Sequence, residues 1–313
     1  MFLVCGEALF DVFIGSEDDQ ALHLDARLGG SPYNVAVGLA RLSKPVAFFG
    51  GLSTDMLGQR LARALEREGV NIELALRFDA PTTLGLVELG GEGVPQYAFY
   101  GNGAADRLPE EGRLPALPAE IGAIHLGSFA TVVEPVASAL EALVRREREG
   151  RLVAYDPNVR LNVEPSLERW RSKVDTLAGL AHLVKISDED AELLYGDASD
   201  DALAASWLDK GTSLVVMTRG GKGASAWNSH GRVDITAPVV EVIDTVGAGD
   251  TFQAAMLAHL AETGALDAAR LASLAPEAVR RLLDFAARAA AITCSRRGAN
   301  LPRRDEVATS PAQ

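Results

Sequence analysis

The residues best suited to chemistry in this sequence form one short glycine-rich segment, residues 244–250 with the sequence DTVGAGD. A helical pattern follows it, and the first N–H groups of a helix lack partners within it and attract anions. Gly247, Ala248 and Gly249 have almost no side chain and would let an anion approach these N–H groups. Asp250 would repel that anion, which makes sense only if its carboxylate removes a proton from a hydroxyl attacking a phosphate. The segment therefore indicates phosphoryl transfer, with Asp250 as base and the three small residues stabilising developing charge.

The elements that position this segment alternate along the chain. Near-continuous apolar runs separated by amphipathic helices are typical of a parallel sheet that is covered by helices on both faces. Ligands of such sheets bind at the carboxyl ends of the strands. We therefore predict one α/β domain over residues 1–313. The expected strands are 46–49, 123–126, 152–155, 183–186, 214–217 and 237–243, and the expected helices are 33–42, 56–68, 136–148 and 276–292.

Two stretches depart from this alternation. Residues 12–28 have no helical pattern, and residues 71–105 are rich in β-forming residues and interrupted by turn sequences. We predict that these discontinuous segments form one small β-sheet lid over the ligand edge of the main sheet.

A second glycine-rich segment, Gly29-Gly30, precedes the first predicted helix. Ser31 is a suitable N-cap for that helix, and proline is favourable in its first turn. These preferences do not explain two glycines followed by Asn34, whose amide can both donate to and accept from a polyol. Asp11 follows the first apolar strand in a G-E-x-x-x-D pattern. Together these residues indicate a site for a sugar.

The DTVGAGD segment, the G-G-x-x-x-N pattern and the G-E-x-x-x-D pattern together resemble the ribokinase-like carbohydrate kinases, the phosphofructokinase-B type family. The resemblance spans nearly the whole chain. It implies a ribokinase-like α/β fold, ATP as phosphoryl donor and a sugar as acceptor. It also implies that the sugar hydroxyls are bound by Asp11, Gly29, Gly30 and Asn34.

The resemblance extends to the nucleotide and metal sites. Residues 218–223 match a T-x-G-x-x-G loop that follows the nucleotide phosphates, with an adenine pocket expected near Arg219. Asp190 stands where the family has a glutamate that places Mg²⁺ through water, and Ser187 replaces its asparagine. Asp244 and residues 293–298 are expected at a monovalent-cation site for K⁺. The residues expected to bind the nucleotide are Lys185, Ser187, Thr218, Gly220, Gly223, Gly247 and Gly249.

Two further segments, residues 97–107 and 154–160, are most similar to bacterial fructokinases. They imply D-fructose as acceptor, phosphorylated at its 6-hydroxyl, with Phe99 stacking on the sugar. Arg160 would bind a phosphate or the substrate, or would form an ion pair with Asp156. A 2-keto-3-deoxygluconate kinase, using Arg107 and Arg160 for the acid, remains an alternative, as does another sugar or nucleoside kinase of the family.

Composition excludes other classes of partner. The net charge of −13 and the pI near 4.9 disfavour nucleic acid and anionic membranes. Dinucleotide-binding and Walker-type glycine patterns are missing from the sequence. Cys5 and Cys294 lie far apart and are predicted to be reduced thiols. The sequence shows no leader or membrane span, so we expect a cytoplasmic protein, and paired lids would protect their strand edges in a homodimer.

Overall fold

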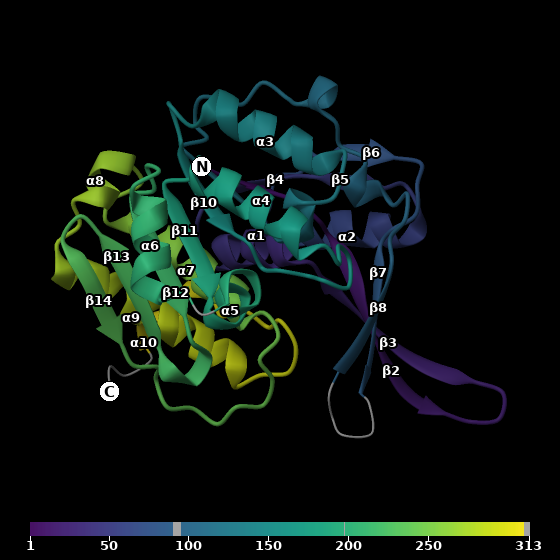
Figure 1. The fold of residues 1–313 in the computed structure, drawn as a ribbon. Helices are drawn as coiled ribbons and strands as arrows, with labels where there is room; N and C mark the ends of the chain where they lie inside the picture. The colour runs from purple at the N-terminus through teal and green to yellow at the C-terminus, as the bar shows by residue number, and fades with distance from the viewer. Residues whose placement is uncertain (90–94, 197, 310–313) are drawn as a thin grey trace.

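The computed structural model describes residues 1–89, 95–196 and 198–309. Its main feature is an eight-stranded sheet in the order β14-β13-β12-β11-β10-β9-β1-β4 (Figure 1). The strands from β12 to β4 are parallel, and β13 and β14 are antiparallel additions at one edge. The strands are β1 (Phe2–Cys5), β4 (Val46–Phe49), β9 (Ala123–Gly127), β10 (Leu152–Asp156), β11 (Leu183–Ser187), β12 (Leu214–Thr218), β13 (Ala224–Asn228) and β14 (Gly231–Ile235).

Successive residues of the parallel strands are buried on opposite faces of the sheet. In β1, Phe2 and Val4 belong to one apolar cluster, whereas Leu3 and Cys5 belong to another. The first cluster also contains residues of α1, α2, α7, α8 and α9, and the second contains residues of α3, α4, α5 and α6. This arrangement confirms the predicted sheet with helices on both faces, and it follows from strands that are apolar at every position. Cys5 and Cys294 are both free thiols, as predicted.

The helices begin and end close to the predicted residues. Within the described residues, no helix has both the length and the hydropathy needed to cross a membrane. One capping prediction was wrong, because Gly30 rather than Ser31 is the N-cap of α1. The helices are α1 (Ser31–Arg41), α2 (Met56–Arg67), α3 (Val136–Glu147), α4 (Leu167–Ala178), α5 (Asp188–Tyr195), α6 (Asp200–Leu208), α7 (Ala248–Glu262), α8 (Ala268–Ala272), α9 (Pro276–Cys294) and α10 (Arg304–Thr309).

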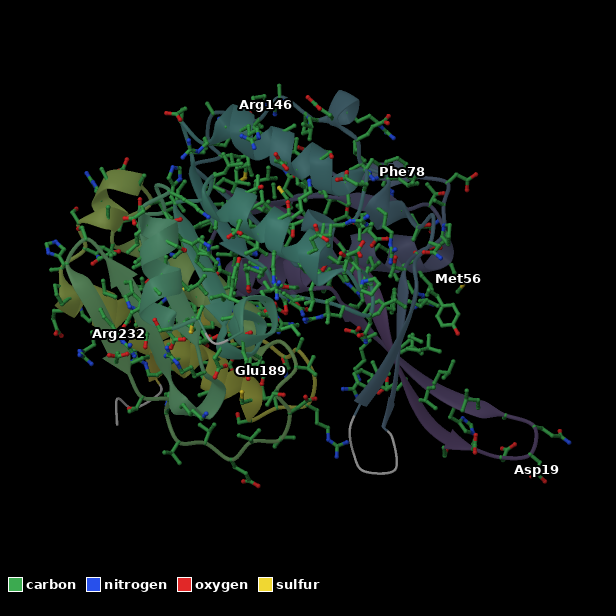
Figure 2. The ribbon with its side chains drawn as sticks, in the orientation of Figure 1. Asp19, Met56, Phe78, Arg146, Glu189 and Arg232 are labelled. Carbon is green, nitrogen blue, oxygen red and sulfur yellow. The ribbon has the colours of Figure 1, made fainter. Side chains whose placement is uncertain are left out.

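A second sheet projects from one side of the molecule, with the order β3-β2-β7-β8 (Figure 1). It comprises β2 (Leu9–Glu17), β3 (Leu22–Gly29), β7 (Leu84–Leu89) and β8 (Pro95–Tyr100). Asp19 lies at the tip of the β2–β3 hairpin, far from the body of the protein (Figure 2). The predicted segment 71–105 was too long, because β6 (Leu76–Phe78) pairs instead with β5 (Gly51–Ser53).

Residues 237–243 do not form the predicted strand. They follow β14 as an irregular, exposed segment, in which Val239 is 84% and Val242 60% exposed. Their β-branched side chains favour an extended backbone, but no neighbouring strand pairs with them in the described structure. The N–H of Ile243 donates to the carbonyl of Cys294, and this contact fixes the approach to residues 244–250. Tertiary context therefore overrides the strand propensity of residues 237–243.

Candidate active site

Asp250 lies in the first turn of α7 and is held by two side chains of α1. Ser31 Oγ donates to Asp250 Oδ1 at 2.6 Å, and Asn34 Nδ2 donates to Asp250 Oδ2 at 2.8 Å. The Asp250 side chain is buried, and this burial raises its pKa. Gly30 is the N-cap of α1, so Ser31 and Asn34 both lie in the first helical turn. Their i, i+3 spacing places both side chains on one face of the helix. Sequence reasoning missed Ser31 as a partner of Asp250, although the i, i+3 spacing of two hydrogen-bonding residues was a usable signal.

The N-terminus of α7 presents an open set of backbone donors. Gly247 has φ of 77°, in the left-handed region, and a Cβ there would lie 2.7 Å from the Ala299 side chain. The N–H of Ala248 donates to the carbonyl of Thr245 at 3.2 Å, so this N–H is engaged within the turn. In the described part of the chain, the N–H groups of Gly247, Gly249 and Asp250 have no hydrogen-bond partner. These three N–H groups form a candidate anion nest, whereas the Ala248 N–H expected there is engaged in the turn.

A buried ion pair lies beside this nest. Lys185 Nζ of β11 is 2.7 Å from Asp156 Oδ2 of β10, and the two side chains are 5% and 1% exposed. A Cβ added to Gly249 would lie 3.2 Å from Lys185 Nζ, so the ammonium group is next to the first turn of α7. Asp156 Oδ1 is buried without a partner in the described structure. Asp156 thus pairs with Lys185, and the alternative ion pair with Arg160 does not form.

Asp11 is enclosed by glycines of the second sheet. A Cβ on Gly29 would lie 2.2 Å from Asp11 Oδ2, and a Cβ on Gly85 would lie 3.2 Å from Asp11 Oδ1. Burial raises the pKa of Asp11 to about 6; the charge of Arg160 opposes this shift, and that of Asp250 adds to it. The structure therefore brings Asp11, Arg160 and Asp250 close enough for their charges to interact, with Gly29 against the Asp11 carboxylate. Because both positions are glycines, no side chain fills the space around the Asp11 carboxylate at these two points.

Phe99 of β8 packs against the body of the protein. Its ring centroid is 6.3 Å from that of Phe129, with the ring planes at 68°. The same Phe129 ring carries the Arg107 guanidinium at 5.5 Å from its centroid. Phe99 also lies 3.0 Å from the position of a Cβ on Gly85, next to Asp11. Phe99 is thus an edge-on packing partner near Asp11.

The sequence analysis did not identify two further buried carboxyl groups, those of Glu7 and Asp106. Glu7 is 1% exposed, and burial raises its pKa to about 8. Asp106 is 2% exposed and accepts a hydrogen bond from Thr83 Oγ1 at 2.6 Å, and burial raises its pKa to about 6. Each has one oxygen without a hydrogen-bond partner in the described structure. The G-E-x-x-x-D pattern contains Glu7, and its position next to Gly6 was the available signal.

Glu7→Gln is expected to flatten the loss of stability with rising pH. Folded Glu7 keeps its proton to about pH 8, whereas the unfolded chain releases it near 4.5, so its contribution to stability is full below pH 4.5 and is lost as pH rises to 8. The upper limit of this loss is about 1.4 kcal/mol per pH unit. Urea unfolding at pH 6.5, 7.25 and 8, above the folded pKa of Asp106, measures it. Identical slopes for both proteins would contradict the assignment.

Asp190 and Ser187 have defined structural partners. Ser187 Oγ accepts from the Asp190 N–H at 3.0 Å and caps α5, and Asp190 Oδ2 accepts from the Val159 N–H at 3.3 Å. Burial raises the pKa of Asp190 to about 6, and the Asp156 charge adds to the shift. The described residues contain no cluster of three carboxylate, histidine or cysteine side chains that could hold a metal. This donor set fits only a metal that keeps its waters and takes further ligands from a phosphate.

Asp244 joins the two loops expected at a monovalent-cation site. Its Oδ1 accepts from the Val246 N–H at 3.0 Å, and its Oδ2 accepts from the Gly298 N–H at 2.8 Å. The expected loops are therefore adjacent. Because both carboxylate oxygens already accept backbone N–H groups, backbone carbonyls are the better candidates for cation ligands.

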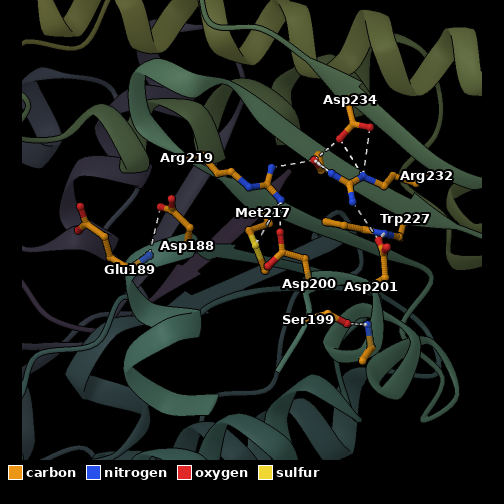
Figure 3. Close-up of polar contacts among 12 residues, drawn as sticks. Asp188, Glu189, Ser199, Asp200, Asp201, Met217, Arg219, Trp227, Arg232 and Asp234 are labelled. Atoms are coloured by element: carbon orange, nitrogen blue, oxygen red, sulfur yellow. Dashed lines mark hydrogen bonds and ion pairs between the residues drawn. The ribbon is translucent and has the colours of Figure 1, made fainter. Parts of the chain in front are cut away.

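The loop expected to follow the nucleotide phosphates contains two glycines with positive φ. Gly220 and Gly223, which follow Thr218, have φ of 48° and 102°, and a Cβ on Gly223 would lie 2.0 Å from the Ile235 carbonyl oxygen. The Arg219 guanidinium, expected near the adenine pocket, donates to Asp200 at 2.6 Å and to Ser225 at 2.7 Å (Figure 3). The charge on Asp200 at the start of α6 explains this direction.

The mostly parallel sheet, the second sheet and the anion nest define a ribokinase-like carbohydrate kinase. The chain belongs to the pfkB family of carbohydrate kinases, whose family model matches residues 2–306. It is 36% identical over 304 residues to a fructokinase of Rhizobium leguminosarum bv. trifolii, covering 97% of this chain and 91% of that protein.

Solved structures agree with this assignment. The crystal structure of a fructokinase with bound ATP from Xylella fastidiosa matches with a TM-score of 0.91 and 28% identity, covering 98% of this chain and 97% of that one. A fructokinase double mutant from Vibrio cholerae O395, in a fructose, ADP and potassium ion bound form, matches with a TM-score of 0.83 and 27% identity, covering 98% and 96%.

Proposed function

We propose that this carbohydrate kinase transfers the γ-phosphoryl group of ATP to the 6-hydroxyl of D-fructose. The observation that carries the proposal is the buried Asp250 carboxylate, held by Ser31 and Asn34 beside open N–H donors of α7. Similarity to fructokinases over nearly the whole chain supports fructose as the acceptor. Asp250 and the open N–H groups lie within one helical turn, and this arrangement supports their use as base and anion nest in phosphoryl transfer to a hydroxyl.

In the proposed reaction, Asp250 removes the proton of the attacking hydroxyl. Burial raises the pKa of this carboxyl, which makes it a stronger base than an exposed aspartate. The N–H groups of Gly247 and Gly249 stabilise charge on the transferred phosphoryl group. Lys185 Nζ lies next to Gly249 and is paired with Asp156, so it places a cationic N–H donor at the same position. Asn34 and Ser31 also orient Asp250, because each donates one hydrogen bond to its carboxylate.

The second sheet supplies the acceptor side of the proposed site. Asp11, Gly29 and Gly85 come from its strands, and Gly30 follows directly, with a Cβ position 2.8 Å from the Glu7 carbonyl oxygen. We assign Asp11 to the fructose hydroxyls and Arg160 to a phosphate or substrate oxygen. Closure of this sheet over the sugar, with Phe99, would exclude water from the transfer.

In this proposal, the metal ions are bound by phosphate oxygens as well as by groups of the protein. Asp190 would hold Mg²⁺ through a water molecule, and the metal would neutralise charge on the ATP phosphates. K⁺ is supported by the loop pair that Asp244 joins and by the potassium-bound Vibrio cholerae structure. Thr218, Gly220, Gly223 and the Ser187 turn lie at the ends of adjacent strands and are assigned to the nucleotide side.

The acceptor is tested by measuring ADP release with Mg-ATP on fructose, 2-keto-3-deoxygluconate, ribose, glucose, mannose and adenosine. We expect the highest kcat/KM with fructose, and phosphorus NMR of the product should show a 6-phosphate ester. Arg107→Gln and Arg160→Gln are tested on the same panel. A higher kcat/KM with 2-keto-3-deoxygluconate that both variants abolish would replace fructose as acceptor and keep the phosphoryl-transfer chemistry.

A homodimer formed through the second sheets is also proposed. Strand β3 lies at one edge of this sheet, and Leu22 and Leu24 on it are 49% and 53% exposed. Unpaired edge strands with apolar side chains favour association with a second copy. Size-exclusion chromatography with light scattering should show a dimer that Leu24→Lys dissociates and His23→Lys, on the alternate face of the strand, preserves. A monomeric parent protein would contradict the proposal.

A further inference from the structure

A cavity of about 330 Å³ lies where α1, α2, the end of β3 and the loop at Ala299 meet. Its lining includes Asn34, which holds Asp250, but not Asp250, Asp11 or Arg160, so the cavity lies beside the proposed sugar and phosphate positions. Tyr33, Val37 and Arg41 come from one face of α1, and Arg67 comes from the last turn of α2. The cavity is therefore a built feature of the body rather than a gap at a loop tip.

The charges around this cavity leave positive charge available. Arg41 donates to both Glu68 carboxylate oxygens at 2.6 and 3.1 Å and to the Leu301 carbonyl at 2.8 Å. Arg303 also pairs with Glu68, at 3.5 Å, so one carboxylate serves two guanidinium groups. Arg67 has no ion pair or hydrogen bond to any described residue. Arg41 and Arg67 line the cavity together with Glu68, so its lining carries a net positive charge in a chain of net charge −13.

The donors that remain unused face a partly apolar cavity. The Tyr33 hydroxyl has no recorded hydrogen-bond partner in the described structure, although the side chain is only 5% exposed. The apolar part of the lining includes Leu28, Val37 and Ala299. An uncommitted guanidinium and a phenolic hydroxyl suit a phosphate or carboxylate group, and the apolar lining suits a short carbon skeleton.

We propose that this cavity binds a small organic anion, through Arg67 and Tyr33, and that its occupancy changes the catalytic rate. Three lining residues connect it to the proposed active site. Asn34 holds Asp250, and Ala299 packs against the position where Gly247 would carry a side chain. Leu28 precedes Gly29, which abuts Asp11. A ligand here would contact the supports of the base, the anion nest and the second sheet at once.

The binding test uses calorimetry on the full-length protein in excess ADP and fructose, which occupy the nucleotide and sugar positions. Glycerol 3-phosphate and succinate are the probes, and glycerol is the uncharged control. We expect one of the two anions to bind at one site per chain. Arg67→Gln should weaken that binding at least tenfold, because it removes charge-assisted hydrogen bonds. Arg63→Gln, the same charge change one helical turn away on α2, should change it less than twofold.

The coupling test adds the bound anion to steady-state assays at saturating ATP and fructose, and rests on the proposed function. We expect kcat to change in the parent enzyme and in Arg63→Gln, and to stay constant in Arg67→Gln. Tyr33→Phe should weaken anion binding while its own kcat without the anion is unchanged. The proposal is overturned if neither anion binds, if Arg63→Gln weakens binding as much as Arg67→Gln, or if binding leaves kcat constant. The calorimetric comparison of Arg67→Gln with Arg63→Gln needs no catalytic turnover, so it separates failure here from failure of the proposed function.

Discussion

Replacing Asp250 with asparagine is expected to lower kcat by about three orders of magnitude, the contribution typical of a positioned general base. The replacement keeps the shape of the side chain, and Ser31 can still donate to the remaining carbonyl oxygen. Asn34 can turn its amide to accept from the new NH₂ group, so the packing between α1 and α7 is retained. The loss should therefore fall on the chemical step. Single-turnover measurements with saturating ATP and fructose isolate that step.

The control for this prediction is Glu189→Gln. Glu189 is an exposed acid in the first turn of α5, and its replacement removes the same charge near a helix N-terminus without touching Asp250. We expect this variant to keep kcat within about twofold, while both variants bind an ATP analogue with unchanged Kd by calorimetry. An Asp250→Asn enzyme with near-parent kcat would rule out the base. A large loss of nucleotide affinity would instead indicate that Asp250 acts in binding.

Replacing Lys185 with methionine is expected to lower the free energy of unfolding by about 3–5 kcal/mol. The change leaves Asp156 charged, 1% exposed and without its 2.7 Å partner, in a site where Asp156 Oδ1 already lacks a hydrogen bond. A methionine fills the space of the lysine stem, so the loss is electrostatic rather than a packing defect. Urea denaturation followed by circular dichroism measures it.

The double variant Lys185→Met with Asp156→Leu separates stability from catalysis. Replacing both members of a buried ion pair with apolar residues is often nearly neutral, so stability should return to within about 1 kcal/mol of the parent. Activity should not return, because the positive charge beside Gly249 is still missing, and KM for ATP should rise at least tenfold. Recovery of full activity along with stability would assign Lys185 a purely structural role. A double variant as unstable as the single one would show that the ion pair is not the cause.

The sequence determined the layered architecture because the relevant signals are local. The runs in β1, β10 and β11 are apolar at every position, and this pattern requires burial on both faces. The DTVGAGD segment likewise specified a helix start with a left-handed glycine, since few other residues accept the φ of Gly247. Such features depend on neighbours in sequence, and the structure retains them.

Tertiary structure decided the partners that come from distant segments. Residues 237–243 have the composition of a strand, yet they pair with no strand in the described part of the chain. Ser31 read as a cap, yet its hydroxyl reaches Asp250 across 219 positions of sequence. An ion pair between Asp156 and Arg160 was one of the alternatives from the sequence, yet the parallel pairing of β10 with β11 places Lys185 beside Asp156. By itself the sequence determined which backbone elements form and which residue types could do chemistry, because those depend on local sterics and periodicity. Only the packing of the helices and strands decided which groups form a hydrogen bond or an ion pair, since packing depends on all of these elements together.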